Sequence, residues 1–336
     1  MTTLRRLFAL TACALCVGLC TPYPLAAQPK PTAQPKPTAQ PTPAAQPKPA
    51  AQPTPAAQPK PAAQPTPAAQ TRVLMWQVQS ATATVYLLGS VHVGSADAYP
   101  LDPRIERAFA EADTLVLEVP LDEAALAKAA GIMQKRGLYA PPDSIDKHLD
   151  PATMTKLKAA IEATGMPLQP FLQMRPWFLA MTIALLRLQA DGFESKHGID
   201  VHFAQAAKGK RFQALETIEA QAGLLADMPV KLQLDNLRQT LDELDQAATM
   251  LRSAFAAWRR GDGPAIDELM LAPFRKQYPA LYKRLFVDRN RRMAKEVERL
   301  LAGKGTAFVV VGAGHLVGKD SIVRMLTTRA RAPRQL

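Results

Sequence analysis

Two Gly-x-x-His motifs are the first sign of chemistry in this sequence. Gly89-Ser-Val-His92 follows the apolar run 85–88, and Gly312-Ala-Gly-His315 follows the apolar run 308–311. In α/β sheets the carboxyl ends of strands face the functional crevice. A glycine at such an end permits either a positive φ or a close approach of the backbone. The repeated motif predicts that both histidines project into one crevice from equivalent strand ends.

A carboxylate stands inside a third apolar run. Glu118 lies within Leu115-Val-Leu-Glu-Val119, and a buried carboxylate is costly unless it is paired or bound to a cation. Two imidazoles and a carboxylate are a common ligand set for a divalent metal that activates water. We predict that His92, His315 and Glu118 bind a divalent metal ion, either Mn²⁺, Co²⁺ or Zn²⁺. Taken singly, each residue is also compatible with a structural role, such as a salt bridge of Glu118.

Two further charged residues are candidates for catalysis. Glu216 ends a predicted strand, like the histidines, while Thr217 is placed to cap the next helix with Glu219 in its first turn. Arg289 interrupts an apolar stripe at four-residue steps that comprises Leu281, Leu285, Met293 and Val297. Its side chain either extends to solvent or meets an anion, which can be Glu118, Glu216 or a substrate oxygen. We therefore add Glu216 and Arg289 to Glu118 as catalytic candidates.

The remaining histidines are weaker candidates. His148 lies in a charged stretch and is predicted to be exposed, and the i, i+3, i+5 spacing of His197, Asp200 and His202 does not fit one helix face. Asp200 is interpreted either as a helix N-cap or as an acid that orients a ligand. A Ser-His-Asp site is not indicated, because the sequence has no Gly-x-Ser-x-Gly motif.

The elements that must position these residues form a mixed α/β pattern. Short β-branched and apolar runs predict strands at residues 73–78, 82–89, 114–119, 211–215 and 306–311. Apolar periodicity and capping residues predict helices at 103–112, 121–133, 151–164, 176–190, 199–208, 217–225, 229–260, 264–270, 279–301 and 321–328. The fold predicted is α/β (mixed α+β), with a central sheet from the N- and C-terminal parts and a helical middle region.

Charge and cysteine usage exclude several classes of function. Of the 336 residues, 41 are Lys or Arg and 29 are Asp or Glu, a net charge of +12. The first 70 residues hold six of the basic residues and no acidic one, so the rest carries 35 against 29, a mild surplus that argues against nucleic acid. All three cysteines lie among the first 20 residues. The remainder therefore has no thiol for a disulfide, a metal site or a nucleophile.

The N-terminal part predicts export. Residues 1–27 have signal-peptide anatomy, with Arg5-Arg6, an apolar run at 7–20 and cleavage after Ala27. That run is shorter than the about 20 residues that span a bilayer, so we expect no transmembrane helix in the mature chain. We predict a periplasmic or secreted protein; the alternative is a lipoprotein anchored through Cys13.

A proline-rich repeat follows the leader. Residues 28–70 consist of six-residue units of the type Ala-Gln-Pro-Lys-Pro-Ala, and proline at every second or fourth position is incompatible with helix and sheet. We predict a disordered, extended linker. It would allow the following domain to work near a cell wall or a membrane surface.

The motifs taken together resemble the TraB/GumN family over about residues 72–328. The matching segments are 88–93, 115–119, Gly198-Ile-Asp200, 215–221, 258–262, 289–294 and 309–318. This family is related to the animal Tiki proteins, described as metal-dependent proteases with two Gly-x-x-His motifs and a glutamate. It also belongs with the erythromycin-esterase-like and ChaN-like proteins.

The resemblance implies a TraB/GumN domain at residues 71–336 with a mixed α/β fold. It implies that His92, Glu118 and His315 form the site, with Arg289 as a helper and with Gly89, Gly312, Asp200 and Asn290 in support. The leading hypothesis is an exported metal-dependent hydrolase, a peptidase acting on a peptide or protein. The alternatives are a non-catalytic module that binds a peptide or polysaccharide, and an esterase that uses the same site. A C-terminal membrane anchor, which Tiki proteins have, is not expected here.

Overall fold

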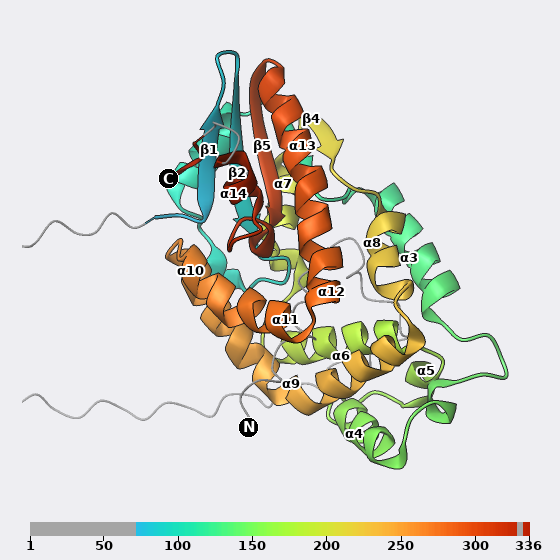
Figure 1. Ribbon diagram of the computed structural model, residues 1–336. Coiled ribbons are helices and arrows are strands. Elements are labelled where there is room, and N and C mark those ends of the chain that lie inside the picture. The colour runs from blue at the N-terminus through green and yellow to red at the C-terminus, as the bar shows by residue number, and fades with distance from the viewer. Residues whose placement is uncertain (1–71, 328–331) are drawn as a thin grey trace, which may run out of the picture. The chain divides into compact units, whose positions relative to one another are not determined.

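The computed structural model describes residues 72–327 and 332–336 (Figure 1). The predicted signal peptide at residues 1–27 and the predicted linker at residues 28–70 lie outside the described residues. In the described part of the chain, no helix has both the length and the apolar character that crossing a bilayer requires.

The described strands form one mixed sheet in the order β4-β3-β5-β2-β1-β6. The pairs β2/β5, β5/β3 and β3/β4 are parallel, while β1 pairs antiparallel with β2 and with β6. The bounds are β1 Met75–Gln79, β2 Ala83–Ser90, β3 Thr114–Leu117, β4 Arg211–Ala214, β5 Gly305–Gly312 and β6 Arg334–Gln335. The predicted central sheet is confirmed, with β6 as an addition. β6 consists of two polar residues, which are too few to show the alternation of apolar and polar side chains that predicts a strand.

Helices cover both faces of this sheet. On one face, Phe109 of α2 (Pro103–Glu111) and Phe203 of α7 (Ile199–Ala206) meet Phe308 of β5, with ring centroids 5.4 and 4.8 Å apart. On the other face lie α13 (Asp288–Ala302) and α14 (Ile322–Thr327) (Figure 1). Because β5 is covered on both sides, its sequence is a continuous apolar run without polar alternation.

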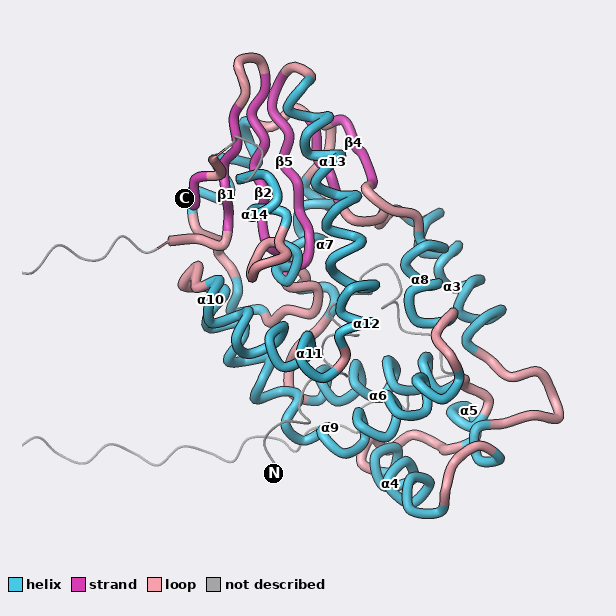
Figure 2. The backbone as a smooth tube through the Cα atoms, in the orientation of Figure 1, coloured by secondary structure: helices cyan, strands magenta, loops and turns pink. Residues whose placement is uncertain are grey.

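The middle of the chain is helical, as predicted. Many of its helices lie beyond the carboxyl ends of β2 and β5, where α6 packs along α9 (Figure 2). Asp122 and Asp150 cap α3 and α4, and a proline begins both α4 and α6. The bounds are α3 Glu123–Gly137, α4 Pro151–Glu162, α5 Gln169–Leu172, α6 Pro176–Ala190, α8 Ile218–Ala226 and α9 Val230–Arg259. The short α5 was not predicted.

Two of the later helices contain a π-helical turn. One runs through α10 (Gly263–Ile266), the π turn η5 (Asp267–Leu271) and α11 (Ala272–Gln277). The prediction of a helix at 264–270 was too short, because it stopped before a proline that the structure places in the first turn of α11. The other runs through α12 (Pro279–Tyr282), the π turn η6 (Lys283–Val287) and α13, as predicted for residues 279–301.

The π turn η6 decides where Arg289 points. A step of four residues exceeds one α-helical turn of about 3.6 residues, so a stripe at such steps drifts around an α-helix. The wider π turn offsets this drift. Arg289 accordingly stays on the side of Leu285, whose carbonyl accepts a hydrogen bond from Arg289 Nη1 at 3.3 Å.

Candidate active site

The two Gly-x-x-His turns leave the sheet side by side. β2 and β5 are parallel neighbours, and Ser90 pairs with Gly312 at the end of their shared register. His92 lies in the loop after β2, and His315 lies in the short 3-10 turn η7 (Ala313–His315) after β5. Both side chains are buried, with exposures of 4% and 1%. The two histidines therefore enter one site from one sheet edge.

The glycines of the two motifs allow a close approach of other groups. Gly312 has a φ of −50°, and neither Gly312 nor Gly89 is among the described glycines with positive φ, so the positive-φ alternative is wrong for both. A Cβ on Gly312 would stand 2.9 Å from His92 Nε2 and 3.3 Å from Glu118 Oε1. Because Gly312 has no side chain, His92 Nε2 and Glu118 Oε1 can occupy the space beside its Cα.

Glu118 follows the end of β3 and is 5% exposed. Its Oε1 accepts a hydrogen bond from the backbone N–H of Gly312 at 2.6 Å. Its Oε2 accepts bonds from Arg289 Nη2 at 2.5 Å and from Gln221 Nε2 at 3.0 Å. Glu118 Oε1 also lies 3.8 Å from Nε2 of each histidine, His92 and His315.

Arg289 is fully buried and joins two carboxylates. Its Nε donates to Glu216 Oε2 at 2.9 Å and its Nη2 to the same oxygen at 2.7 Å, beside the bond to Glu118. Its Nη1 donates to His315 Nε2 at 3.0 Å. The alternative in which Arg289 extends to solvent is wrong, because both acids lie within reach of the buried guanidinium. Glu216, at the end of β4, is thus brought to the same cluster.

The partners of the Nδ1 atoms fix both imidazole tautomers. His92 Nδ1 lies 3.2 Å from Asp200 Oδ1, and His315 Nδ1 lies 2.5 Å from Asn290 Oδ1. Asn290 Nδ2 donates to the Asp320 carbonyl at 2.7 Å, so the Asn290 oxygen faces the ring. Each Nδ1 therefore carries the proton and each Nε2 carries a lone pair; that of His315 accepts from Arg289 Nη1, and that of His92 has no hydrogen-bond partner.

Asp200 occupies the orienting position and does not cap a helix. The N-cap of α7 is Gly198, and Asp200 lies in the first turn with its carboxylate turned to His92. The N-cap interpretation of Asp200 is wrong, because its carboxylate binds His92 Nδ1 and accepts a hydrogen bond from Ser90 Oγ at 3.0 Å. Thr217 does cap α8, as predicted, by accepting from the N–H of Ala220 at 3.1 Å.

This chain carries the sequence pattern of the TraB/PrgY/gumN family over residues 74–334. The chain belongs to the TraB/PrgY/gumN family. The match spans every element described above that contributes to the cluster, and the resemblance inferred from the motifs is confirmed.

Two relatives are similar to this chain over about three quarters of its length. The uncharacterised protein YbaP of Escherichia coli is 26% identical over 245 residues, which cover 72% of this chain and 87% of that protein. An uncharacterised protein of Treponema pallidum is 20% identical over 269 residues, which cover 76% of this chain and 80% of that protein. No solved structure matches the chain.

Three residues of the TraB/PrgY/gumN domain belong to the site although no role was predicted for them. Ser90 and Gln221 hold the carboxylates of Asp200 and Glu118, and Trp258 Nε1 donates to the Gly89 carbonyl at 2.5 Å. All three stand in the segments that carry the family resemblance. Their position in those segments could have indicated a role in the site. The spacing of residues in the sequence does not show which partner a serine, glutamine or tryptophan will contact.

The other histidines of the domain do not join the site. His148 is exposed and lies 2.8 Å from Asp143, as expected for a surface residue. His202 lies 3.4 Å from Glu106, and His197 is half-buried on η4 (Ser195–His197).

The electrostatics of the cluster separate the two imidazoles. Burial alone would lower the pKa of His92, but Asp200 and Glu118 outweigh it and raise that pKa above its ordinary value. Burial and the adjacent Arg289 guanidinium lower the pKa of His315 to about 3. Burial raises the pKa of Glu118, but Arg289 and the histidines outweigh this effect and lower it to about 2. The site therefore keeps Glu118 ionised and attracts positive charge at His92.

The predicted ligands have the donor types that a divalent metal ion takes. Among residues 72–327 and 332–336, no three His, Cys, Asp or Glu side chains form a ready-made metal group. The 3.8 Å separations exceed by a few tenths of an ångström the about 3.4 Å between tetrahedral ligands at about 2.1 Å from a metal. However, His92 Nε2 is buried without a hydrogen-bond partner. His315 would have to exchange its bond from Arg289 for a metal.

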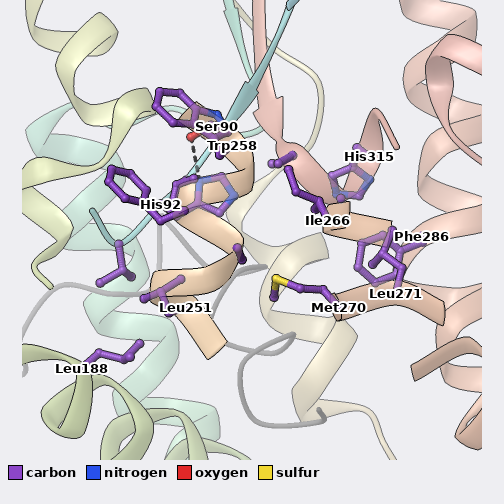
Figure 3. A pocket seen from close by; sticks show the side chains of 17 residues that line it. Ser90, His92, Leu188, Leu251, Trp258, Ile266, Met270, Leu271, Phe286 and His315 are labelled. Carbon is purple, nitrogen blue, oxygen red and sulfur yellow. Dashed lines mark hydrogen bonds between the residues drawn. The ribbon is translucent and has the colours of Figure 1, made fainter. Parts of the chain in front are cut away.

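A cavity opens over the two histidines (Figure 3). His92, His315, Ser90 and Gly312 lie at one end of it, and apolar side chains of α9, η5 and η6 line the remainder. Glu118 and Arg289 are not among its lining residues. A molecule in the cavity would therefore meet the imidazoles first, with the charged groups behind them.

Replacing Gly312 with alanine is expected to damage this cluster. The new methyl group would push against His92 Nε2 and Glu118 Oε1, and overpacking of this kind costs about 1–3 kcal/mol of folding free energy. Gly131 in α3 is a matched control, because a Cβ there meets nothing within 4 Å. Gly131→Ala should stabilise the helix by about 0.5–1 kcal/mol. Urea unfolding measures both, and equal effects would contradict the close approach.

The depressed pKa of His315 predicts a loss of stability in acid. Between about pH 6.5 and about pH 3 the unfolded chain binds a proton at this residue and the folded chain does not. The free energy of unfolding therefore falls with pH in this window, by up to about 1.4 kcal/mol per unit from this group. Unfolding curves from pH 7 to pH 4 should show a smaller slope for His315→Gln than for wild type. An unchanged slope in His315→Gln would refute the assignment.

Proposed function

We propose that this chain is an exported metal-dependent hydrolase, a peptidase, whose metal ligands are His92, His315 and Glu118. One observation carries the proposal: a buried imidazole nitrogen, His92 Nε2, has no hydrogen-bond partner and faces a buried carboxylate. The surrounding charge supports it. The cluster holds three carboxylates, Asp200 beside His92 and Glu118 and Glu216 beside Arg289, and Arg289 is its one buried guanidinium, so the carboxylates exceed the guanidinium by two negative charges that a bound cation would balance.

A divalent ion bound there supplies Lewis-acid activation of water and of a carbonyl oxygen. The chain's own residues prepare the place. Asp200 and Asn290 hold the Nδ1 protons, so each Nε2 keeps a lone pair; that of His92 is free, and that of His315 becomes free once its bond from Arg289 is released. Glu118 Oε1 faces both nitrogens and serves in this proposal either as a ligand or as the acceptor of a proton from water.

Arg289 acts in this proposal by positioning other groups. It is absent from the lining of the cavity, so contact with a substrate oxygen is not its first task. It holds Glu118 and Glu216 in place and keeps Glu118 ionised through its charge. Glu216 in turn anchors the guanidinium through Nε and through Nη2, the nitrogen that also bonds Glu118. Export is supported by the leader and the proline-rich repeat in the sequence.

The test is metal binding followed by turnover. The full chain is titrated calorimetrically with Mn²⁺, Co²⁺ and Zn²⁺ and then incubated with a peptide library. We expect one of these ions to bind at one site per chain and to support cleavage, and both properties to disappear in His92→Ala and His315→Ala. The exposed His148→Ala is the matched control and should behave as wild type. No metal binding in the wild type would refute the proposal, and binding without turnover would favour a non-catalytic module.

A second candidate, a metal-independent esterase, is favoured by the pair of Asp200 and His92. The carboxylate raises the pKa of the imidazole, and Nε2 is free at the end of a cavity, which is the arrangement of a general base. This function predicts hydrolysis of chromogenic esters that a chelator does not inhibit. Chelator-sensitive turnover would exclude it.

A further inference from the structure

We propose that the cavity over His92 and His315 is a recognition pocket for one aliphatic side chain beside the scissile bond of a peptide. The inference rests on the proposed hydrolase and adds the class of substrate. Leucine, isoleucine or valine would be accepted at this position, and charged residues would be rejected, because most of the side chains around the cavity are apolar (Figure 3).

The walls of the cavity carry no charged side chain among the described residues that line it. Four elements contribute apolar groups that face the same space, including Leu188 of α6, Leu251 and Ala254 of α9, Met270 and Leu271 of η5, and Phe286 of η6. A charged group that enters must give up its hydration, and nothing in these walls can replace it. The walls therefore select for apolar groups.

The polar groups of the cavity are confined to one end. Ser90, His92 and His315 lie there, next to the backbone of Gly312 and Gly314. Pockets that bind small groups are typically apolar with a few polar residues that fix orientation. An occupant is thus held in one direction, with its apolar side chain among the walls and its carbonyl at the imidazoles.

The size of the cavity favours an aliphatic group over an aromatic ring. Its volume is about 80 Å³, whereas an apolar cavity that takes up benzene measures about 150 Å³. A branched chain of three or four carbons fits this space with small adjustments. Met270, which is only partly buried and lies on a π turn, is the flexible side chain that can make them.

Binding is tested without turnover. The full chain is labelled with ¹³C-methyl methionine, and the Met270 signal is assigned with Met270→Leu. N-acetyl-leucinamide is expected to shift this signal saturably, and N-acetyl-lysinamide at the same concentration to leave it unmoved. Equal shifts with both amides, or none with the leucine compound, would overturn the pocket whether or not the protein hydrolyses peptides.

Turnover provides the second arm. In a peptide series that varies one residue beside the cleaved bond, leucine is expected to exceed phenylalanine, lysine and glutamate in kcat/KM by about 10-fold or more. Met270→Lys should reduce leucine cleavage by a similar factor and raise glutamate cleavage, a change of preference that simple unfolding cannot produce. Leu269→Lys, on the same π turn but outside the lining, is the matched control.

The two proposals fail separately. If no peptide is cleaved but the leucine amide shifts Met270, the peptidase is refuted and the pocket remains. If peptides are cleaved with equal kcat/KM for leucine and lysine, the pocket is refuted and the peptidase remains.

Discussion

Glu118→Gln is expected to reduce peptide hydrolysis by about 10²- to 10⁴-fold, the usual contribution of a positioned proton acceptor. Glutamine preserves the shape of the side chain, but its single amide oxygen can accept from only one of the two donors, the Gly312 N–H or Arg289, so the variant loses one hydrogen bond as well as the charge. It removes the negative charge that faces both Nε2 atoms, so metal affinity should fall together with kcat. Calorimetric titration and single-turnover cleavage measure the two effects on the same preparation.

The matched control for this change is Glu219→Gln. Glu219 lies in the first turn of α8 and pairs with Lys128 on the surface at 2.6 Å, with 48% of its side chain exposed. An exposed pair of this kind contributes little to stability, and Glu219 is remote from the cavity lining. Its variant should bind metal and turn over as wild type does. Full activity in Glu118→Gln would show that Glu118 is a structural partner of Arg289 and nothing more.

The convergence of the two histidines could be predicted from the sequence because it depends on strand ends. Two apolar runs that each end in Gly-x-x-His predict parallel strands of the same sheet, and parallel neighbours place their carboxyl ends at one edge. Glu118 follows from the same logic, since a carboxylate in an apolar strand needs a partner. Strands made of continuous apolar runs can be recognised from the local sequence, and the structure contains the expected parallel pairs β2/β5 and β3/β5.

The partners of these residues could not be predicted in the same way. The direction of Arg289 depends on the π turn Lys283–Val287, which has no distinct sequence signal. Asp200 has the sequence of a helix cap, and only the tertiary placement of His92 shows that its carboxylate points elsewhere. Gln221 reaches Glu118 across 103 residues of sequence. Contacts of this range are decided by packing, which periodicity does not record.

Arg289→Met is expected to destabilise the fold by about 3–5 kcal/mol, because it leaves Glu118 and Glu216 buried without their common cation. Methionine fills a similar volume, so the loss measures charge and hydrogen bonding more than packing. Guanidinium chloride unfolding followed by circular dichroism gives the free energy. Arg289→Lys keeps the charge but cannot reproduce the planar fork, and it should recover only part of the loss.

The surface neighbour Arg292 separates this effect from the general loss of a positive charge on α13. Arg292 is 60% exposed and approaches Glu216 only to 3.5 Å, so Arg292→Met should change stability by no more than about 0.5 kcal/mol. Adding Glu216→Gln to Arg289→Met should return part of the lost stability, since one of the stranded charges is then gone. If Arg289→Met were as stable as Arg292→Met, Arg289 could not be what keeps Glu118 ionised. The negative charge of Glu118, on which the proposed metal site depends, would then have to be maintained by its other donors, the Gly312 N–H and Gln221.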